Sequence, residues 1–205
     1  MVPISYKLGL ENTCTLRNFD IRQQQTLNVT IAEALLATLA TPPRFSSASL
    51  FKDAAALEYV GGELTISNPA REVIAEGHGV FGPEGLIACL LSLGCGHSGV
   101  IVAPEESDSA GWSQFLEKLF RDNEQKAQII EAQMGHLGLY HRFSVTRGLE
   151  RRTSTNTPKL GDVLAHTAVY LSAVTISRKM DLCVDSIKIR DGIASLEQLS
   201  EFRFC

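Results

Sequence analysis

Residues 59–69 read Y-V-G-G-E-L-T-I-S-N-P, and residues 86–96 read L-I-A-C-L-L-S-L-G-C-G. Residues 86–93 form an apolar run with almost no polar alternation, which is typical of a strand covered on both faces in a parallel sheet. Asn68 and Pro69 supply a helix cap and a proline at the first helical position, so a helix is predicted to follow. Together the two stretches favour a layered α/β fold.

Helices and strands are predicted on both sides of these stretches. Thr30 and Glu33 have the spacing of a capping box, and the apolar residues after them predict a helix that ends at Pro42. Apolar residues at three- and four-residue spacing predict the other helices, and short β-rich runs predict the strands. The predicted helices are 70–75 (ending at Gly77 or Gly79), 112–134, 160–171 and 177–187, and the predicted strands are 14–19, 86–93 and 140–145.

Composition limits the function classes. The chain has 205 residues, of which 44% are hydrophobic and 20% charged, so it is long enough to bury a core as a single domain over residues 1–205. The net charge is -4, and the charges are interspersed rather than gathered in blocks. We therefore expect no nucleic-acid partner.

Cysteine and histidine spacing predicts no metal site or disulfide framework. The five cysteines are Cys14, Cys89, Cys95, Cys183 and Cys205; their number is odd and they contain no C-x-x-C pair. The five histidines show no H-E-x-x-H spacing. There is no secretory leader pattern and no apolar run of about 18 residues, so we expect no transmembrane segment and a cytoplasmic protein, peripheral to membranes if it contacts them.

Several of these segments resemble the patatin-like phospholipase family, in its fungal type. Residues 30–45 (T-I-A-E-A-L-L-A-T-L-A-T-P-P-R-F) resemble the family's T-I-W-E-A-x-x-A-T-x-A-x-P-x-x-F helix, and residues 59–69 resemble its acid loop. Residues 142–150 and 159–172 are similar to the C-terminal part of such domains. The resemblance covers residues 14–188 and implies a three-layer α/β/α domain with a mostly parallel central sheet, a Ser-Asp dyad, lipid or fatty-acyl ester substrates, and no cofactor.

The acid loop departs from the family pattern at its catalytic position. Gly61 stands where the family has the aspartate, and Gly61 and Gly62 suit a plain turn that needs positive φ. Glu63 is the alternative carboxylate, two residues later; its other interpretation is an exposed loop or strand residue. The sequence also contains no G-x-S-x-G, the turn that carries a nucleophilic serine. The resemblance places that elbow before residue 1, so we expect the chain to be the C-terminal half of a patatin-like domain.

Three other motifs have alternative interpretations. Residues 94–99 (G-C-G-H-S-G) match G-x-G-x-x-G, but an extended segment with a proline follows where a dinucleotide site needs a helix, so a structural turn is favoured. Cys95 and His97 are spaced as a thiol and a base, although cysteine is more often a packing residue. The basic residues Arg147, Arg151, Arg152 and Lys159 are more typical of a solvated loop than of an anion site.

Three functional hypotheses follow. The first is a degenerate or truncated patatin-like protein, a pseudoenzyme without acyl hydrolysis of its own. The second is an active serine lipid acyl hydrolase whose serine comes from an upstream half and whose carboxylate is replaced. The third is a lipid- or protein-binding module. If the N-terminal strands of the family's sheet are absent, a strand that should be central becomes an exposed edge, so poor solubility or self-association through that edge is expected.

Overall fold

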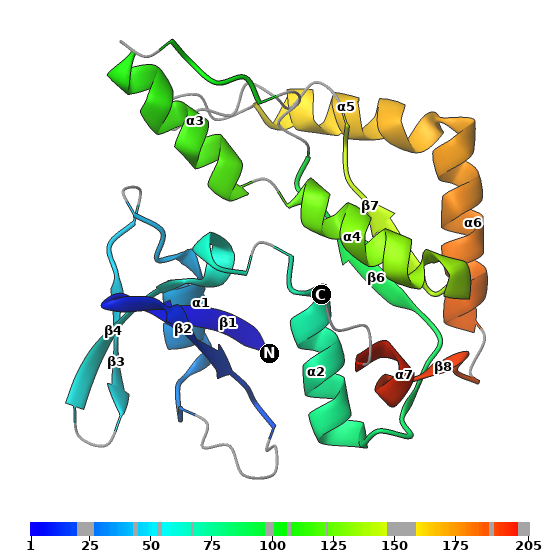
Figure 1. The fold of residues 1–205 in the computed structure, drawn as a ribbon, viewed down its shortest axis with the longest axis horizontal. Coiled ribbons are helices and arrows are strands. Elements are labelled where there is room, and N and C mark those ends of the chain that lie inside the picture. Colours follow the sequence, from blue (N-terminus) through cyan, green and yellow to red (C-terminus); the bar gives the residue numbers. More distant parts are fainter. Residues whose placement is uncertain are drawn as a thin grey trace. The chain divides into compact units, whose positions relative to one another are not determined.

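The computed structural model describes residues 1–19, 27–42, 45–52, 55–66, 68–96, 101–105, 108–121, 123–146, 159–188 and 191–200. The chain divides into two compact units, Met1–Pro69 and Ala70–Cys205. Both units mix helices and strands, as the α/β prediction requires (Figure 1). The prediction that residues 1–205 form a single patatin-like domain stays a prediction.

A four-stranded antiparallel sheet organises the N-terminal unit. The order is β2-β1-β4-β3, and α1 packs on the sheet (Figure 1). Lys7 and Leu8 join β1 to β2, a link too short for the crossover that parallel pairing needs. The elements are β1 (Val2–Tyr6), β2 (Gly9–Leu16), α1 (Ile31–Leu39), β3 (Ala48–Lys52), β4 (Ala55–Gly61) and the 3-10 turn η1 (Gly62–Leu64). The core is Ile4, Leu16, Leu27, Ala37, Leu50 and Tyr59.

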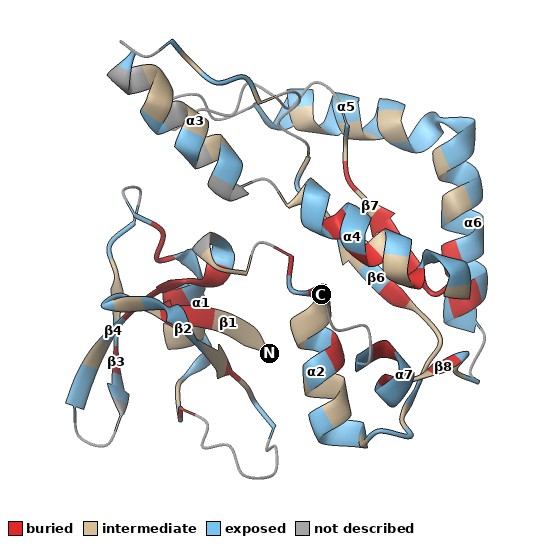
Figure 2. Ribbon diagram, viewed as in Figure 1, coloured by how far each residue is buried: buried red, intermediate tan, exposed pale blue. Residues whose placement is uncertain are grey.

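The C-terminal unit is mainly helical around two short strand pairs. β6 pairs in parallel with β7, β5 pairs antiparallel with β8, α4 packs on β7, and α2 packs on α7. Figure 2 shows buried positions on β6, β7 and α4, and an α5 that is largely exposed. The elements are α2 (Ala70–Phe81), β5 (Leu86–Ile87), β6 (Leu90–Leu93), α3 (Ser109–Arg121), α4 (Glu124–Met134), η2 (Gly135–Leu137), β7 (Tyr140–Phe143), α5 (Leu160–Ser172), α6 (Val174–Lys188), β8 (Ala194–Ser195) and α7 (Leu196–Ser200).

The mostly parallel central sheet predicted from residues 86–93 is wrong for the described residues. Their sheets are small and mostly antiparallel, and β6 with β7 is the parallel pair. The apolar run is not one strand, because residues 88–89 separate β5 from β6. It is not covered on both faces either, since Leu86, Leu91 and Leu93 are 62%, 45% and 74% exposed. An unbroken apolar run therefore did not mean two covered faces here.

The helix after Pro69 is longer than predicted. It runs through Gly77 to Phe81 and ends at Gly82, whose φ of 81° is the left-handed conformation common after a helix. Gly77 lies within the helix and against Leu196, whose Cδ2 atom would be 3.2 Å from an added Cβ. The missing side chain gives room for α7, so here glycine marks a close contact rather than a helix end.

Most other predicted elements are present with shifted bounds. The strand predicted at 140–145 is confirmed by β7. The helices predicted to begin near residues 30, 160 and 177 are confirmed by α1, α5 and α6, in that order. The predicted strand 14–19 overlaps β2, which begins earlier. The predicted helix 112–134 is two helices, α3 and α4. Among the described residues no single helix is long and apolar enough to cross a membrane; α5 and α6 together meet that test and bend by 80°.

The capping box at the start of α1 makes a testable contribution to stability. Thr30 Oγ1 accepts from the Glu33 backbone N–H at 3.3 Å, and the Thr30 N–H donates to Glu33 Oε2 at 2.7 Å. We expect Thr30→Ala to lower the free energy of unfolding at neutral pH by about 1 kcal/mol, measured by urea denaturation. Unchanged stability would show that the box contributes nothing.

The same box gives a pH dependence. The hydrogen bonds from the Thr30 backbone and hydroxyl lower the pKa of Glu33. Its folded pKa is thus below its unfolded value, so this stabilisation is present above the unfolded pKa and is lost as pH falls through the folded pKa. Glu33→Gln should be less stable than wild type at neutral pH, and this difference should disappear in acid. A difference that is the same at both pH values would contradict the prediction.

Candidate functional site

The predicted acid loop lies at the end of β4, in the N-terminal unit. Gly61 is the last residue of β4 and pairs with Ile4 of β1, and its N–H donates to the Ala40 carbonyl at 2.9 Å. Gly62 and Glu63 form the following 3-10 turn with Leu64. Gly61 and Gly62 are buried, whereas Glu63 is exposed. The three candidate residues are therefore adjacent but face different surroundings.

Space rather than backbone conformation requires glycine at both positions. Gly61 has φ -59° and ψ 143°, so the positive φ that we predicted for it is wrong. A Cβ at Gly61 would lie 2.4 Å from the Thr38 carbonyl oxygen, and one at Gly62 would lie 2.6 Å from the Pro3 carbonyl oxygen. Both obstacles are backbone atoms, which cannot rotate away as a side chain can. Gly61, where the resemblance would place an aspartate, has no room for any side chain.

Hydroxyl groups beside the loop bond to each other. Ser5 Oγ, fully buried, lies 2.8 Å from Thr65 Oγ1, and Thr65 Oγ1 also donates to the Gly62 carbonyl at 3.3 Å. These contacts fix the turn after β4. They account for the hydroxyls as structural groups, so the loop is a packed corner of the sheet.

The remaining candidates from the sequence are separated or fall outside the described residues. Cys95 is exposed and Gly96 has a φ of 105°, in agreement with a turn after β6. His97 and the end of the glycine motif lie outside the described residues, as do Arg147, Arg151 and Arg152. Lys159 is exposed just before α5. Neither the Cys95–His97 pair nor the basic stretch can be assembled into a site from these residues.

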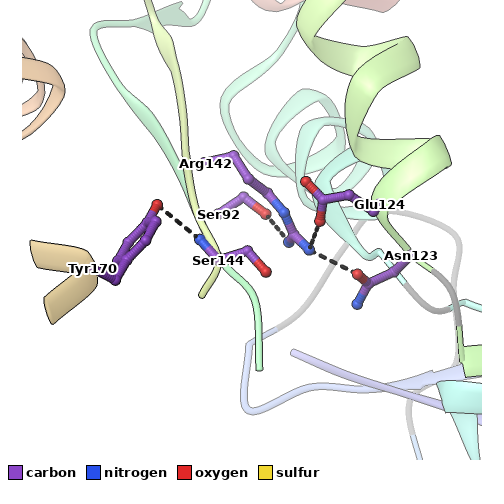
Figure 3. Close-up of polar contacts among 6 residues, drawn as sticks. All are labelled: Ser92, Asn123, Glu124, Arg142, Ser144 and Tyr170. Carbon is purple, nitrogen blue, oxygen red and sulfur yellow. Dashed lines mark hydrogen bonds and ion pairs between the residues drawn. The ribbon is translucent and has the colours of Figure 1, made fainter. Parts of the chain in front are cut away.

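A buried arginine lies at the carboxyl ends of the parallel strands (Figure 3). The side chain of Arg142, on β7, is 7% exposed, and its guanidinium donates to Ser92 Oγ at 3.0 Å and to Asn123 Oδ1 at 2.7 Å. Glu124, the first residue of α4, neutralises it with Oε2 at 3.2 Å. Two neutral acceptors and one carboxylate thus surround the guanidinium. Through these contacts Arg142 connects the start of α4 to β6 and β7.

The polar cluster continues past the end of β7. The Ser144 N–H donates to the Tyr170 hydroxyl of α5 at 3.2 Å (Figure 3). Ser144 and Arg142 also crowd Gly94, where an added Cβ would lie 2.5 Å from Ser144 Oγ. With its charge already paired, Arg142 acts as a structural link at the strand ends. This role had no signal in the sequence, because the partners Ser92, Asn123 and Glu124 are at least 18 residues from Arg142 in the chain.

Two thiols and an imidazole meet in the C-terminal unit. Cys89 precedes β6, His141 lies on β7, and Cys183 lies on α6; one ligand atom of each is within 4.8 Å of the others. His141 and Cys183 are each only 5% exposed. Burial and the neighbouring Cys183 thiol raise the pKa of Cys89 to about 11, and burial lowers the pKa of His141. Burial therefore favours the neutral forms of Cys89 and His141.

Spacing could not have predicted this thiol and imidazole cluster. Its three residues are far apart in the chain and belong to no C-x-x-C or H-x-x-H pattern. The parallel pairing sets Leu91 opposite His141, which brings the segment that precedes β6 close to the start of β7. The fold of α6 then adds Cys183. Only long-range structure assembles the cluster.

Comparison of the chain with protein families, with curated proteins and with solved structures gives no match. Membership of the patatin-like family therefore stays a prediction.

Proposed function

We propose that this protein is a patatin-like pseudoenzyme that does not hydrolyse acyl esters by itself. The closed space at Gly61 supports this proposal most directly. A serine nucleophile needs a base within hydrogen-bond reach, and Gly61 can neither supply a carboxylate nor be replaced by one without moving the Thr38 backbone. The 205 residues contain no G-x-S-x-G of their own.

Glu63 does not restore the missing acid in this proposal. It lies two residues beyond Gly61, on the exposed side of the 3-10 turn. A shift of two residues moves the carboxylate by several ångströms from the position that the resemblance gives to the aspartate. The loop therefore has a structural role in packing the end of β4 rather than a catalytic one.

A serine-directed fluorophosphonate label tests the proposal on the full chain. We expect neither labelling nor hydrolysis of p-nitrophenyl butyrate, while an active serine esterase reacts under the same conditions. Labelling at one site per chain, abolished when the labelled serine is changed to alanine, would overturn the proposal. It would favour the second hypothesis, an acyl hydrolase with a replaced carboxylate.

A second function, binding of acyl chains at a lipid surface, is favoured by the exposed face of α5. Val163, Thr167 and Tyr170 are its partly buried positions. An exposed apolar stripe runs along the helix, because residues four and seven apart lie on the same helical face. It consists of Leu160, Leu164 and Leu171, which are 73%, 61% and 41% exposed. Apolar side chains in water are unfavourable, and lipid tails would remove them from it. The family resemblance supplies the choice of lipid as the occupant.

Vesicle sedimentation tests this second function. The wild-type chain should bind phosphatidylcholine vesicles, and Leu164→Ser with Leu171→Ser should weaken binding at least about tenfold, because each lost side chain removes apolar area worth more than about 1 kcal/mol. Leu8→Ser is the matched control, since Leu8 is fully exposed in the N-terminal unit. Equal binding by the double variant, or dimerisation without vesicle binding, would contradict the prediction.

A further inference from the structure

The cluster of Cys89, His141 and Cys183 has the chemistry of a soft divalent cation site. Thiolate sulfur and imidazole nitrogen are the donors that zinc prefers, at about 2.3 Å and 2.0–2.1 Å. Donors around one tetrahedral ion lie within about 4 Å of each other, so atoms that are mutually within 4.8 Å need only small rotations to reach it. The three donors come from separate elements, which is how a fold presents ligands around an ion.

The surroundings of His141 hold its ring in place. Nε2 lies 3.1 Å from Ser186 Oγ. Nδ1 is therefore the ring nitrogen that would bind a metal, and it would give up its interaction with the Gly138 backbone to do so. Ser186 in turn donates to the Leu182 carbonyl at 2.9 Å, so its own position on α6 is fixed. Metal-binding histidines usually have such a partner on the ring, which sets the tautomer and orientation.

Charged groups near the ring do not exclude a cation. Lys179 and Glu131 face His141, and they pair with each other at 3.7 Å. Their charges therefore largely cancel at the cluster. A divalent cation with two thiolates and a neutral imidazole is itself neutral, which suits this buried position.

We propose that Cys89, His141 and Cys183 bind one zinc ion, with water as its fourth ligand. On binding, two S–H bonds break, two metal–sulfur bonds form, and two protons leave to solvent. The ion would join the start of β6, β7 and α6 into one unit. Three protein ligands and an open fourth position form the coordination set of a reactive zinc rather than of a closed structural one.

Disulfide formation between Cys89 and Cys183 is the competing outcome. It would remove two electrons and two protons, and so it needs an oxidant that the protein does not hold. Both thiols are free in the structure. An oxidised pair would show as the loss of two hydrogen atoms in the intact mass and would block metal binding.

Cobalt titration of the reduced, metal-free full chain tests the proposal. Adding Co²⁺ should produce thiolate-to-cobalt charge-transfer absorption and the visible bands of a tetrahedral site, saturating at one ion per chain. One equivalent of Zn²⁺ should then remove both signals, because zinc prefers a tetrahedral sulfur and nitrogen site. If the wild-type chain shows no such bands, or binds without sulfur signatures, the proposal is wrong.

Matched cysteine variants locate the site. Changing Cys183 to serine should weaken metal binding more than about 100-fold, because even loss of an outer-sphere partner costs about 10- to 100-fold. Cys95→Ser should bind like wild type, since Cys95 is exposed and outside the cluster. Circular dichroism of each variant without metal separates misfolding from ligand loss, and His141→Gln repeats the test without changing a thiol. Full binding by either cluster variant would overturn the assignment.

Ser186 provides a separate readout as a positioning residue. Ser186→Ala removes the contact at His141 Nε2 but no metal ligand, so the cobalt bands should persist while the affinity falls about tenfold. Ser186→Thr keeps the hydroxyl and should restore most of the affinity. Loss of the bands in Ser186→Ala, with the fold intact, would show that the serine is itself a ligand.

Discussion

Replacing Gly61 with aspartate is expected to destabilise the protein by more than about 3 kcal/mol and to create no esterase activity. The new Cβ would lie 2.4 Å from the Thr38 carbonyl oxygen, so the end of β4 or of α1 must move. Overpacking of this kind costs about 1–3 kcal/mol. A carboxylate placed in the buried corner beside a carbonyl oxygen adds a desolvation cost.

A three-variant comparison separates the steric and charge effects. Gly61→Ala introduces the clash alone, and Gly61→Asp adds the charge. Gly161→Asp makes the same chemical change in the first turn of α5, where an added Cβ meets nothing within 4 Å. Asp is favourable there because it lies near a helix N-terminus, so no loss of stability is expected. Urea denaturation measures the free energy of unfolding of the three variants. A Gly61→Asp protein as stable as wild type would show that the space beside Gly61 is not closed.

Removing the counterion of Arg142 is expected to have the other large effect. Glu124→Gln leaves a guanidinium whose side chain is 7% exposed facing only neutral acceptors, and should cost about 3 kcal/mol. Arg142→Met should cost less, about 2 kcal/mol. The cost is smaller because Glu124 is 22% exposed and reaches water once Arg142 is gone. The remaining cost comes from the lost hydrogen bonds to Ser92 and Asn123.

A double-mutant cycle isolates the pairing energy. Arg142→Met with Glu124→Gln leaves no buried charge, so its cost should be at least about 1 kcal/mol below the sum of the single variants. Lys188→Met is the control, because it breaks the exposed pair with Asp185 and should change stability by less than about 0.5 kcal/mol. Strict additivity would mean that Arg142 and Glu124 contribute independently.

Local sequence signals predicted the helices well because those signals act within a few residues. Thr30 and Glu33 form their box as expected, since both hydrogen bonds lie within a single helical turn. The same reasoning failed at Gly77, which does not end the helix and packs against Leu196 of a distant helix. It also failed for the parallel sheet, because an apolar run records hydrophobicity and not which faces are covered.

The sequence by itself determined that glycine stands at residue 61, where the resemblance would place an aspartate, and that these 205 residues contain no G-x-S-x-G. The tertiary structure decided why glycine is there: the Thr38 and Pro3 carbonyls fill the space beside Gly61 and Gly62. The tertiary structure likewise decided that Cys89, His141 and Cys183 meet and that Arg142 is paired inside the protein. Strand pairing and helix packing create these contacts between residues that are far apart in the chain, and spacing along the chain carries no record of such contacts.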